Sequence, residues 1–270
     1  MKYFLGIDIG STSIKIALLN EQNELTASSI SPTGSRFHKN AVDALQNLLA
    51  VNNISDNEIA YTLSTGYGRK LFKESNETIN EITANANGAR GLQKEFNNIK
   101  TIINVGGQDL KVISLDSAGH VKNFVMNDKC AAGTGRFLEM ASRNLEVDID
   151  EFSELHFQSK ESPLPLNSTC AVFAESEIIS LLAAGHNKGE LVAGIHYSIA
   201  KRIARLASRV GVEDDVLFDG GAALNKGLVA ALEDELMRKI YVPESPQITT
   251  AIGAATIAKD IYTQNNLVLL

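Results

Sequence analysis

Two glycine-rich turns are the segments of this 270-residue sequence best suited to binding phosphate. The first turn consists of Gly10, Ser11 and Thr12, and the second of Gly106, Gly107, Gln108 and Asp109. Each turn follows a run of β-branched residues that predicts a strand. Glycine lets the backbone come close to a ligand and aim several amides into one concavity, so each turn could cradle a phosphate. Hairpins also use glycine without any ligand, and that interpretation stays open for each turn taken alone.

The two turns belong to an internal repeat. Residues 7–25 align with residues 103–121, an offset of 96 residues (103 minus 7), and Lys15 then coincides with Lys111. Each copy predicts a strand, the glycine turn, a second strand, another turn and a third strand. A duplicated meander predicts two similar lobes. Two such turns could clamp a polyphosphate, with Asp8 and Asp109 holding Mg²⁺ directly or through water.

A third glycine signal follows the short strand predicted for residues 216–219. It consists of Gly220, Gly221, Ala222 and, three residues later, Asn225, just before a predicted helix. Such a turn admits a flat or phosphorylated ligand. An ordinary junction between a strand and a helix remains the alternative interpretation.

The two cysteines, Cys130 and Cys170, each come just before a predicted helix. The amides and dipole of a helix N-terminus stabilise an anion such as a thiolate. Two unrelated buried cysteines are the alternative interpretation. Two cysteines are too few for a closed zinc or iron–sulfur site in one chain, but two copies related by a twofold axis would supply four thiolates.

The remaining pattern alternates between strand and helix periods. Helices are predicted at residues 38–51, 81–96, 136–145, 173–184, 190–210 and 226–239, and a further strand at residues 59–64. This order predicts an α/β protein with a mixed sheet in each lobe. We expect lobe I to comprise residues 1–96 plus roughly 250–270, and lobe II to comprise residues 97–249.

Composition narrows the class of partner. The chain has 25 Lys and Arg against 32 Asp and Glu, a net charge of −7, which argues against nucleic acid as a partner. No apolar run is long enough for a membrane span and no signal peptide is recognisable, so we expect a cytoplasmic protein that binds no membrane.

The two glycine turns and the segment at residues 220–225, in this order, resemble the phosphate and adenosine motifs of the acetate and sugar kinase, heat-shock ATPase and actin superfamily. The resemblance implies two duplicated lobes of the ribonuclease-H-like type with ATP in the cleft between them. The sequence contains no Walker A pattern and no Gly-x-Gly-x-x-Gly after a strand.

The segments around both cysteines resemble the activator component of 2-hydroxyacyl-CoA dehydratases, in the BadF/BadG/BcrA/BcrD-type ATPase family. That resemblance implies an anaerobic homodimer sharing one 4Fe-4S cluster held by Cys130 and Cys170, with ATP hydrolysis driving one-electron transfer to a partner enzyme. The partner would be a dehydratase, a benzoyl-CoA-reductase-type enzyme or a double-cubane-cluster protein. The expected electron donor is ferredoxin or flavodoxin.

Two residues depart from the pattern of this family. Asn104 replaces an acidic residue at the start of the second hairpin, which weakens a metal or base assignment there, and Asn85 replaces a frequent histidine. Gln108 and Asp109 are therefore the expected residues for positioning the attacking water, and Asp8, with its expected role at Mg²⁺, is the third expected catalytic residue. A small-molecule kinase of the same fold and a nucleotide-switched binding module without redox chemistry remain alternatives, although the chemistry of a kinase does not explain the cysteines.

Other polar residues are expected to have structural roles. The five histidines show no metal-ligand spacing, and the series Lys201, Arg202, Arg205 and Arg209 is expected to form a solvated face, with a possible contact to the acidic partner or to adenosine.

Overall fold

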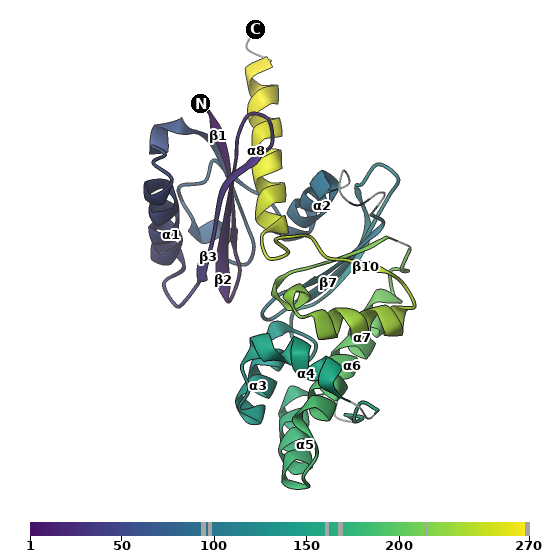
Figure 1. The fold of residues 1–270 in the computed structure, drawn as a ribbon. Helices are drawn as coiled ribbons and strands as arrows, with labels where there is room; N and C mark the ends of the chain where they lie inside the picture. Colours follow the sequence, from purple (N-terminus) through teal and green to yellow (C-terminus); the bar gives the residue numbers. More distant parts are fainter. Residues whose placement is uncertain (93–95, 97–98, 160–161, 167–169, 214, 268–270) are drawn as a thin grey trace. The chain divides into compact units, whose positions relative to one another are not determined.

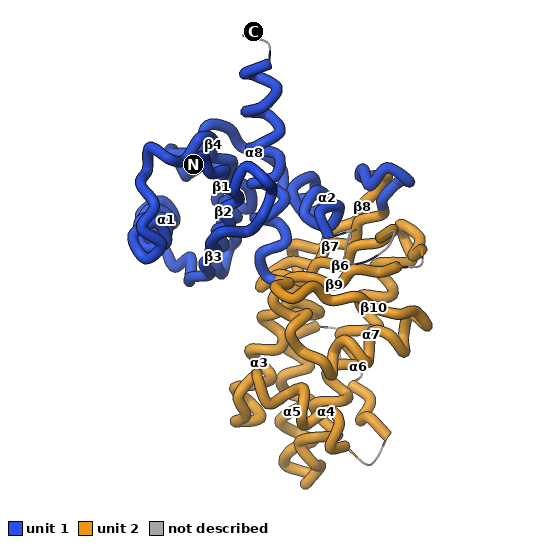
Figure 2. Tube along the Cα trace, turned by 45° about the horizontal axis from the view of Figure 1, so that its top comes forward, with its two compact units in different colours: residues 1–98, 115–121, 247–270 blue, residues 99–114, 122–246 orange. Residues whose placement is uncertain are grey.

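Mainly apolar residues, all of them buried, make β1 (Tyr3–Ile9) and β6 (Thr101–Val105) the central strands of two sheets. The computed structural model describes residues 1–92, 96, 99–159, 162–166, 170–213 and 215–267. The chain divides into two compact units (Figure 2). Unit 1 comprises Met1–Asn98, Leu115–Val121 and Gln247–Leu270, and unit 2 comprises Ile99–Ser114 and Lys122–Pro246.

Unit 1 contains a five-stranded mixed sheet in the order β3-β2-β1-β4-β5. The strands after β1 are β2 (Ser13–Leu19), β3 (Leu25–Pro32), β4 (Ile59–Thr65) and β5 (Glu77–Thr78), and the helices are α1 (Phe37–Val51), α2 (Glu81–Gly91) and α8 (Thr249–Leu267). Alternation along β1 sends Leu5, Ile7 and Ile9 toward α1, whereas Phe4 packs with residues of α2 and α8. Helices therefore cover both faces of this sheet (Figure 1).

Glycines allow α8 to lie close to its neighbours. A Cβ atom on Gly6 would lie 2.0 Å from the carbonyl oxygen of Ala251 in α8. A Cβ on Gly253 would lie 1.8 Å from the carbonyl oxygen of Ala84 in α2. Asn85, which has no role in the sequence-based prediction, donates from Nδ2 to Thr250 Oγ1 at 3.1 Å and so joins the same two helices.

Unit 2 contains a second five-stranded mixed sheet in the order β10-β9-β6-β7-β8. Its other strands are β7 (Leu110–Leu115), β8 (Val121–Asn127), β9 (Val216–Asp219) and β10 (Ile240–Tyr241), and its helices are α3 (Gly135–Leu145), α4 (Phe152–Gln158), α5 (Ala171–Ala183), α6 (Lys188–Ala207) and α7 (Lys226–Leu236). One hydrophobic core joins this sheet to all five helices. The predicted pair of mixed sheets is therefore confirmed.

The two sheets repeat one topology. In each, the central strand pairs antiparallel with the next strand of the meander and parallel with a strand from later in the chain, β4 or β9. Asp8 faces Lys15 across the first hairpin, and Asn104 faces Lys111 across the second. The repeat found over residues 7–25 thus extends in three dimensions to β4 and β9, where the sequence alignment does not reach.

Several predicted element boundaries were wrong. The helix predicted at residues 81–96 ends at Gly91, whose residue type is a poor helix former, and residues 93–95 lie outside the described part of the chain. α6 begins two residues earlier than predicted because Asn187 caps it, accepting from the amide of Gly189. The seven-residue α4 was missed, since two turns carry little periodic signal.

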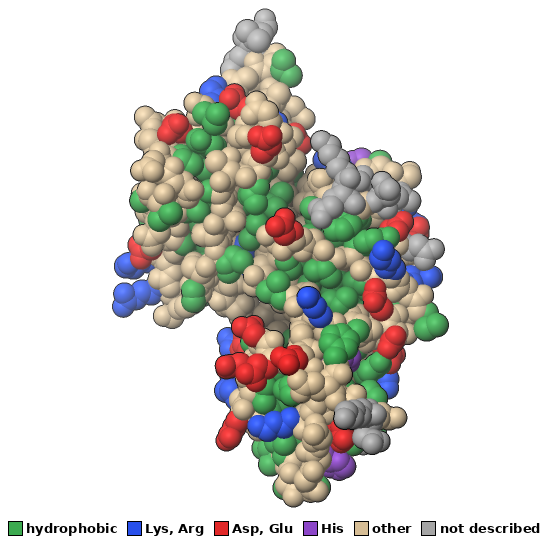
Figure 3. Space-filling view, viewed as in Figure 1, with side chains coloured by type: hydrophobic (Ala, Val, Ile, Leu, Met, Phe, Trp, Pro, Cys, Tyr) green, Lys and Arg blue, Asp and Glu red, His purple; other side chains and the backbone are tan. Residues whose placement is uncertain are grey.

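The distribution of charged side chains on the surface agrees with the net charge of −7. Figure 3 shows basic side chains interspersed with acidic ones on the face drawn, rather than one broad basic area among its described residues. Among the described residues, no helix is both long enough and apolar enough to span a membrane.

Candidate functional site

The two glycine turns are the tips of equivalent hairpins. The amide of Gly10 donates to the carbonyl of Ser13 at 3.0 Å, and the amide of Gly106 donates to the carbonyl of Asp109 at 2.9 Å. The loop residues between these bonds are partly or fully exposed: Ser11, Thr12, Gly107 and Gln108. Both tips are therefore open to an incoming ligand in their own unit.

A polar pair lies beneath the first turn. Lys15 Nζ is 3.1 Å from Asp8 Oδ2, and both side chains are largely buried. Their neighbours on the same strands, Ile7, Ile9 and Ile14, point to the opposite, α1-covered face. The lysine therefore already neutralises Asp8, so a cation at Asp8 would compete with Lys15.

The second turn carries a larger polar network at the equivalent place. Lys111 Nζ lies 2.9 Å from Asp109 Oδ1 and 3.4 Å from Asn104 Oδ1. Asn104 Nδ2 in turn donates to Asp219 Oδ1 at 2.7 Å, and Asp219 is fully buried. Asn104 thus sits directly beside a carboxylate supplied by β9.

Asp219 is not among the site residues predicted from the sequence. The residue stands at the end of a predicted strand, directly before Gly220, which is the signal that could have identified it. The pairing of β9 with β6, which brings Asp219 opposite Asn104, is a long-range contact that no local pattern contains.

Gly220 occupies a position that only glycine fits. Its φ is +88°, and a Cβ would lie 2.3 Å from the carbonyl oxygen of Val105. Gly66 has φ +85°, and its Cβ would lie 2.7 Å from the carbonyl oxygen of Ile9, the residue that corresponds to Val105 in the repeat. The third glycine signal is therefore the unit 2 copy of a turn that unit 1 also contains.

Asn225 ends this third segment. Gly221 and Ala222 belong to a short 3₁₀ helix (Gly221–Leu224), and Asn225 follows as the N-cap of α7. Its side-chain oxygen accepts from the amide of Leu228 at 3.1 Å.

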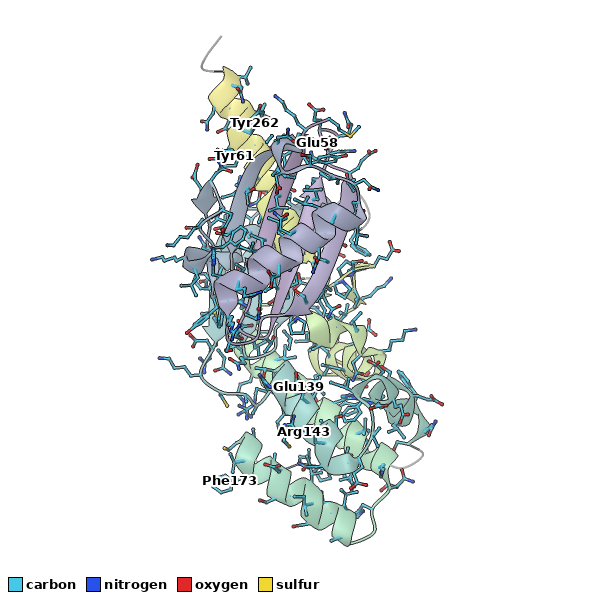
Figure 4. All side chains as sticks on the ribbon, turned by 90° about the vertical axis from the view of Figure 1, so that its left-hand side faces the viewer. Glu58, Tyr61, Glu139, Arg143, Phe173 and Tyr262 are labelled. Atoms are coloured by element: carbon cyan, nitrogen blue, oxygen red, sulfur yellow. The ribbon has the colours of Figure 1, made fainter. Side chains whose placement is uncertain are left out.

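The cysteines have different local settings. Cys170 is exposed and is the N-cap residue of α5, as expected. Cys130 is half-buried and precedes α3, which begins one residue before its predicted start and has Thr134 as its N-cap, so a short loop separates this cysteine from the helix. Figure 4 shows Phe173 projecting from the first turn of α5, and this side chain is 69% exposed.

Arg202 reaches Cys130 from α6. Its guanidinium nitrogen lies 3.6 Å from Cys130 Sγ. A Cβ on Gly133 would lie 2.7 Å from Arg202 Cδ, and Gly133 has φ +89°, so glycine makes room for the arginine stem. Arg202 was expected on a solvated face, which was wrong, whereas Lys201, Arg205 and Arg209 are exposed.

The second glycine turn is joined directly to α3. The amides of Gly135 and Arg136, the first two residues of the helix, donate to the carbonyls of Gly106 and Gly107, both at 2.9 Å. A movement of the turn would therefore displace the start of α3 and the Cys130 loop that leads into it.

The donor set of one chain is incomplete for a metal cluster. Within the described residues, no group of three or more His, Cys, Asp and Glu side chains could hold a metal ion. Cys130 and Cys170 are both free thiols. Two sulfur donors per chain fit a four-thiolate cluster only when a second copy supplies the other two.

Two histidines for which the sequence predicts no role lie next to each other. His156 and His196 lie in contact, with their Nδ1 atoms 3.0 Å apart, although sequence spacing suggested nothing for either. The pair is a contact between α4 and α6, which positions 40 residues apart in sequence do not reveal.

Comparisons with known proteins show the family to which the chain belongs. The model of the BadF/BadG/BcrA/BcrD ATPase family matches residues 5–258. The activator of lactoyl-CoA dehydratase from Anaerotignum propionicum is 43% identical over 258 residues, covering 95% of this chain and 97% of that protein. The (R)-2-hydroxyglutaryl-CoA dehydratase activating ATPase from Acidaminococcus fermentans is 40% identical, covering 95% of this chain and 96% of that protein.

A solved structure is also closely similar. It is the activator of the 2-hydroxyisocaproyl-CoA dehydratase from Clostridium difficile with bound ADPNP. The TM-score is 0.91 at 39% sequence identity, and the match covers 98% of this chain and 97% of that one.

Proposed function

Because the chain belongs to the BadF/BadG/BcrA/BcrD ATPase family, we propose that it is an ATP-dependent activator of a 2-hydroxyacyl-CoA dehydratase. In this proposal a homodimer hydrolyses ATP and passes single electrons from one shared 4Fe-4S cluster to the partner enzyme. Reduced ferredoxin or flavodoxin would supply each electron, and the reaction would take place in the cytoplasm.

One observation carries the proposed coupling between ATP and the cysteines. Gly106 and Gly107, in the turn proposed to bind phosphate, accept hydrogen bonds from the first two amides of α3. The Cys130 loop leads directly into that helix. A phosphate that pulls on the turn would therefore shift the Cys130 loop, and loss of the phosphate would release it.

The nucleotide is proposed to use three segments. The exposed tips at Ser11 and Thr12, and at Gly107 and Gln108, would donate amides to phosphate oxygens, with Lys15 as a nearby positive charge. The turn at Gly220, Gly221, Ala222 and Asn225 would hold the adenosine. The similarity to a structure with bound ADPNP supports this assignment.

Hydrolysis is assigned to the second turn. Gln108 is exposed and can orient a water by hydrogen bonding, and the carboxylate of Asp109 beside it can accept a proton from that water. Lys111 holds Asp109 in place. Mg²⁺ would enter bound to the phosphates, with Asp109 and Asp8 contacting its waters, since both carboxylates already have lysine partners.

Cys130 and Cys170 from each of two copies would hold the cluster. When bound, a 4Fe-4S cluster supplies a one-electron donor of low potential. The chain contributes the N-terminus of α5 at Cys170 and the guanidinium of Arg202 at Cys130, and both favour negative charge on sulfur.

The proposal is tested by iron and nucleotide analysis of anaerobically purified protein. We expect a brown protein with about four iron atoms per dimer. Cys130→Ser and Cys170→Ser should each lose the colour and keep ADPNP binding, whereas Val172→Ser, a neighbouring exposed position, should keep both.

The same preparation separates the alternatives. A colourless protein that transfers phosphate from ATP to a small molecule would be a kinase, and colour that survives both cysteine changes would contradict the cluster assignment. Addition of reduced ferredoxin, ATP and a 2-hydroxyacyl-CoA dehydratase should activate that dehydratase, and omission of ATP should abolish the effect.

A further inference from the structure

A chain of side-chain hydrogen bonds in unit 2 connects α4, α6 and the N-cap of α7. His156 on α4 lies 3.0 Å from His196 on α6, Nδ1 to Nδ1. The other ring nitrogen of His196, Nε2, lies 2.9 Å from Asn225 Nδ2. The chain therefore ends on the last residue of the segment to which adenosine binding is assigned.

The direction of each bond in this chain follows from Asn225. Its Oδ1 accepts from the backbone amide of Leu228 at 3.1 Å and from Ser153 Oγ at 3.2 Å. A backbone amide can only donate, so the amide oxygen of Asn225 must face Leu228 and its nitrogen must face His196. Ser153 Oγ itself accepts from the amide of Lys226 at 2.9 Å, which further fixes this arrangement.

The tautomers of both histidines then follow. Asn225 Nδ2 is a donor, so His196 Nε2 must accept and His196 Nδ1 must carry the proton. That proton points at His156 Nδ1, which must accept, so the proton of His156 is on Nε2. Both rings are neutral when this series of hydrogen bonds is complete.

Burial agrees with two neutral rings. His196 is fully buried, and burial, followed by the nearby His156, lowers the pKa of His196 to about 3. Burial also lowers the pKa of His156, opposed by the carboxylate of Asp234 on α7. Asp234 is itself bound by the hydroxyl of Tyr197 on α6 at 2.5 Å. Among the described residues, the titratable groups that face His156 from the packed helices α6 and α7 are His196, Tyr197 and Asp234.

A proton gained by His156 would disturb the far end of the chain. His156 Nδ1 would become a donor facing the N–H of His196. His196 could relieve this only by moving its proton to Nε2, which would then face the donor Nδ2 of Asn225. Asn225 cannot turn over without losing the cap of Leu228, so the conflict reaches the first turn of α7.

We propose that His196 is a positioning residue for the nucleotide-binding turn at residues 220–225, and that His156 makes this positioning depend on pH. His196 does not touch the nucleotide in this proposal. It orients Asn225, and through Asn225 the start of α7. The inference rests on the proposed nucleotide function of the turn.

The test compares ADPNP affinity of the full-length protein between about pH 8 and pH 5.5 by calorimetry. His156→Gln keeps an oxygen acceptor for His196 and cannot gain a proton. We expect it to bind as the unchanged protein does at pH 8 and to lose less affinity on acidification. Titration of ADPNP itself is the same in both proteins and cancels in the comparison.

Two further variants separate positioning from general stability. His196→Leu should weaken ADPNP binding about tenfold at pH 8, since Asn225 loses its acceptor. Ile199→Val, at a buried position one turn further along α6, should lower thermal stability and leave affinity unchanged. Nitrogen-15 correlation spectra of the histidine rings should show the proton of His196 on Nδ1 and that of His156 on Nε2.

The outcomes are distinct. Parallel pH profiles for the unchanged protein and His156→Gln, unaltered binding by His196→Leu, or the opposite tautomers would each overturn the inference while leaving the proposed function intact. Absence of ADPNP binding by the unchanged protein at every pH would overturn the proposed function, and the inference with it.

Discussion

At the scale of single residues, the second hairpin differs from the first in where its negative charge lies. In the first hairpin Asp8 pairs with the lysine across the strand, and in the second Asn104 takes that place. The negative charge comes instead from Asp109 in the turn and Asp219 on β9. An exposed turn that carries its own carboxylate is better placed to act on water than a buried pair.

Replacing Asp109 should therefore affect hydrolysis more than binding. For Asp109→Asn we expect kcat for ATP hydrolysis to fall about 100-fold, since an amide cannot accept a proton from water, while ADPNP affinity changes only a few-fold. Phosphate release and calorimetry measure the two quantities. Ser13→Ala, at the matching position of the first turn, is the control, and an unchanged kcat in Asp109→Asn would reject the assignment.

Arg202 should raise the midpoint potential of the proposed cluster. Its guanidinium lies 3.6 Å from Cys130 Sγ and favours the more negative, reduced state of a bound cluster. We expect Arg202→Gln to keep its iron and to show a lower midpoint potential in a redox titration followed by electron paramagnetic resonance. Arg205→Gln, an exposed position on the same helix, should titrate as the unchanged protein does. Equal potentials in all three proteins would show that Arg202 only packs against the loop.

At the scale of elements, the turns after β4 and β9 show that the repeat includes backbone conformation. Gly66 and Gly220 have nearly the same φ, and each lies against a carbonyl of its own central strand. Such close backbone approach leaves no room for a side chain.

The glycine turn after β9 can be tested against a glycine with a similar φ but open surroundings. Gly185 has φ +85° and nothing within 4 Å of its hypothetical Cβ, whereas the Cβ on Gly220 would lie 2.3 Å from the carbonyl oxygen of Val105. We expect Gly185→Ala to cost about 1–2 kcal/mol of unfolding free energy from backbone strain alone. Gly220→Ala should cost more and also weaken ADPNP binding, as measured by chemical denaturation and calorimetry. Equal losses in both variants would mean that the contact with Val105 is easily relieved.

At the scale of the whole molecule, one chain provides an ATPase fold and, in the proposed function, two of the four thiolates of a shared cluster. Two units share a single sheet topology, and each has its own helices on that sheet. The number of iron atoms per chain therefore tests both the proposed dimer and the proposed cluster.

The stability of the molecule should also depend on pH. The pKa of His196 is about 3 in the folded chain against an ordinary value of 6.5, so between these values the unfolded chain binds a proton that the folded chain does not. The contribution of neutral His196 to the free energy of unfolding is therefore fully present above about pH 6.5. It falls on acidification by up to about 1.4 kcal/mol per pH unit. Thermal unfolding at pH 7.5 and pH 5.5 should show the lower Tm at the acidic pH. The difference should shrink in His196→Leu, and a Tm that rises on acidification would contradict the buried neutral state.

The sequence by itself determined the local features. Strand and helix periods, the two hairpin tips and the cap at Cys170 depend on residues within a few positions of one another, so pattern and residue type predict them. The repeat with its offset, and the motifs around both cysteines, also indicate the family, because they are runs of neighbouring residues that need no long-range contact to be recognised.

Only the tertiary structure decided which distant side chains meet. Arg202 and Cys130 are 72 residues apart, Asn104 and Asp219 are 115 apart, and His196 meets Asn225 across 29 residues. Periodicity tells which face of an element is buried, but the partner on that face depends on how the whole chain packs. For this reason the sequence indicated which residues are proposed to bind and react, whereas the contacts that position them became visible only in the folded chain.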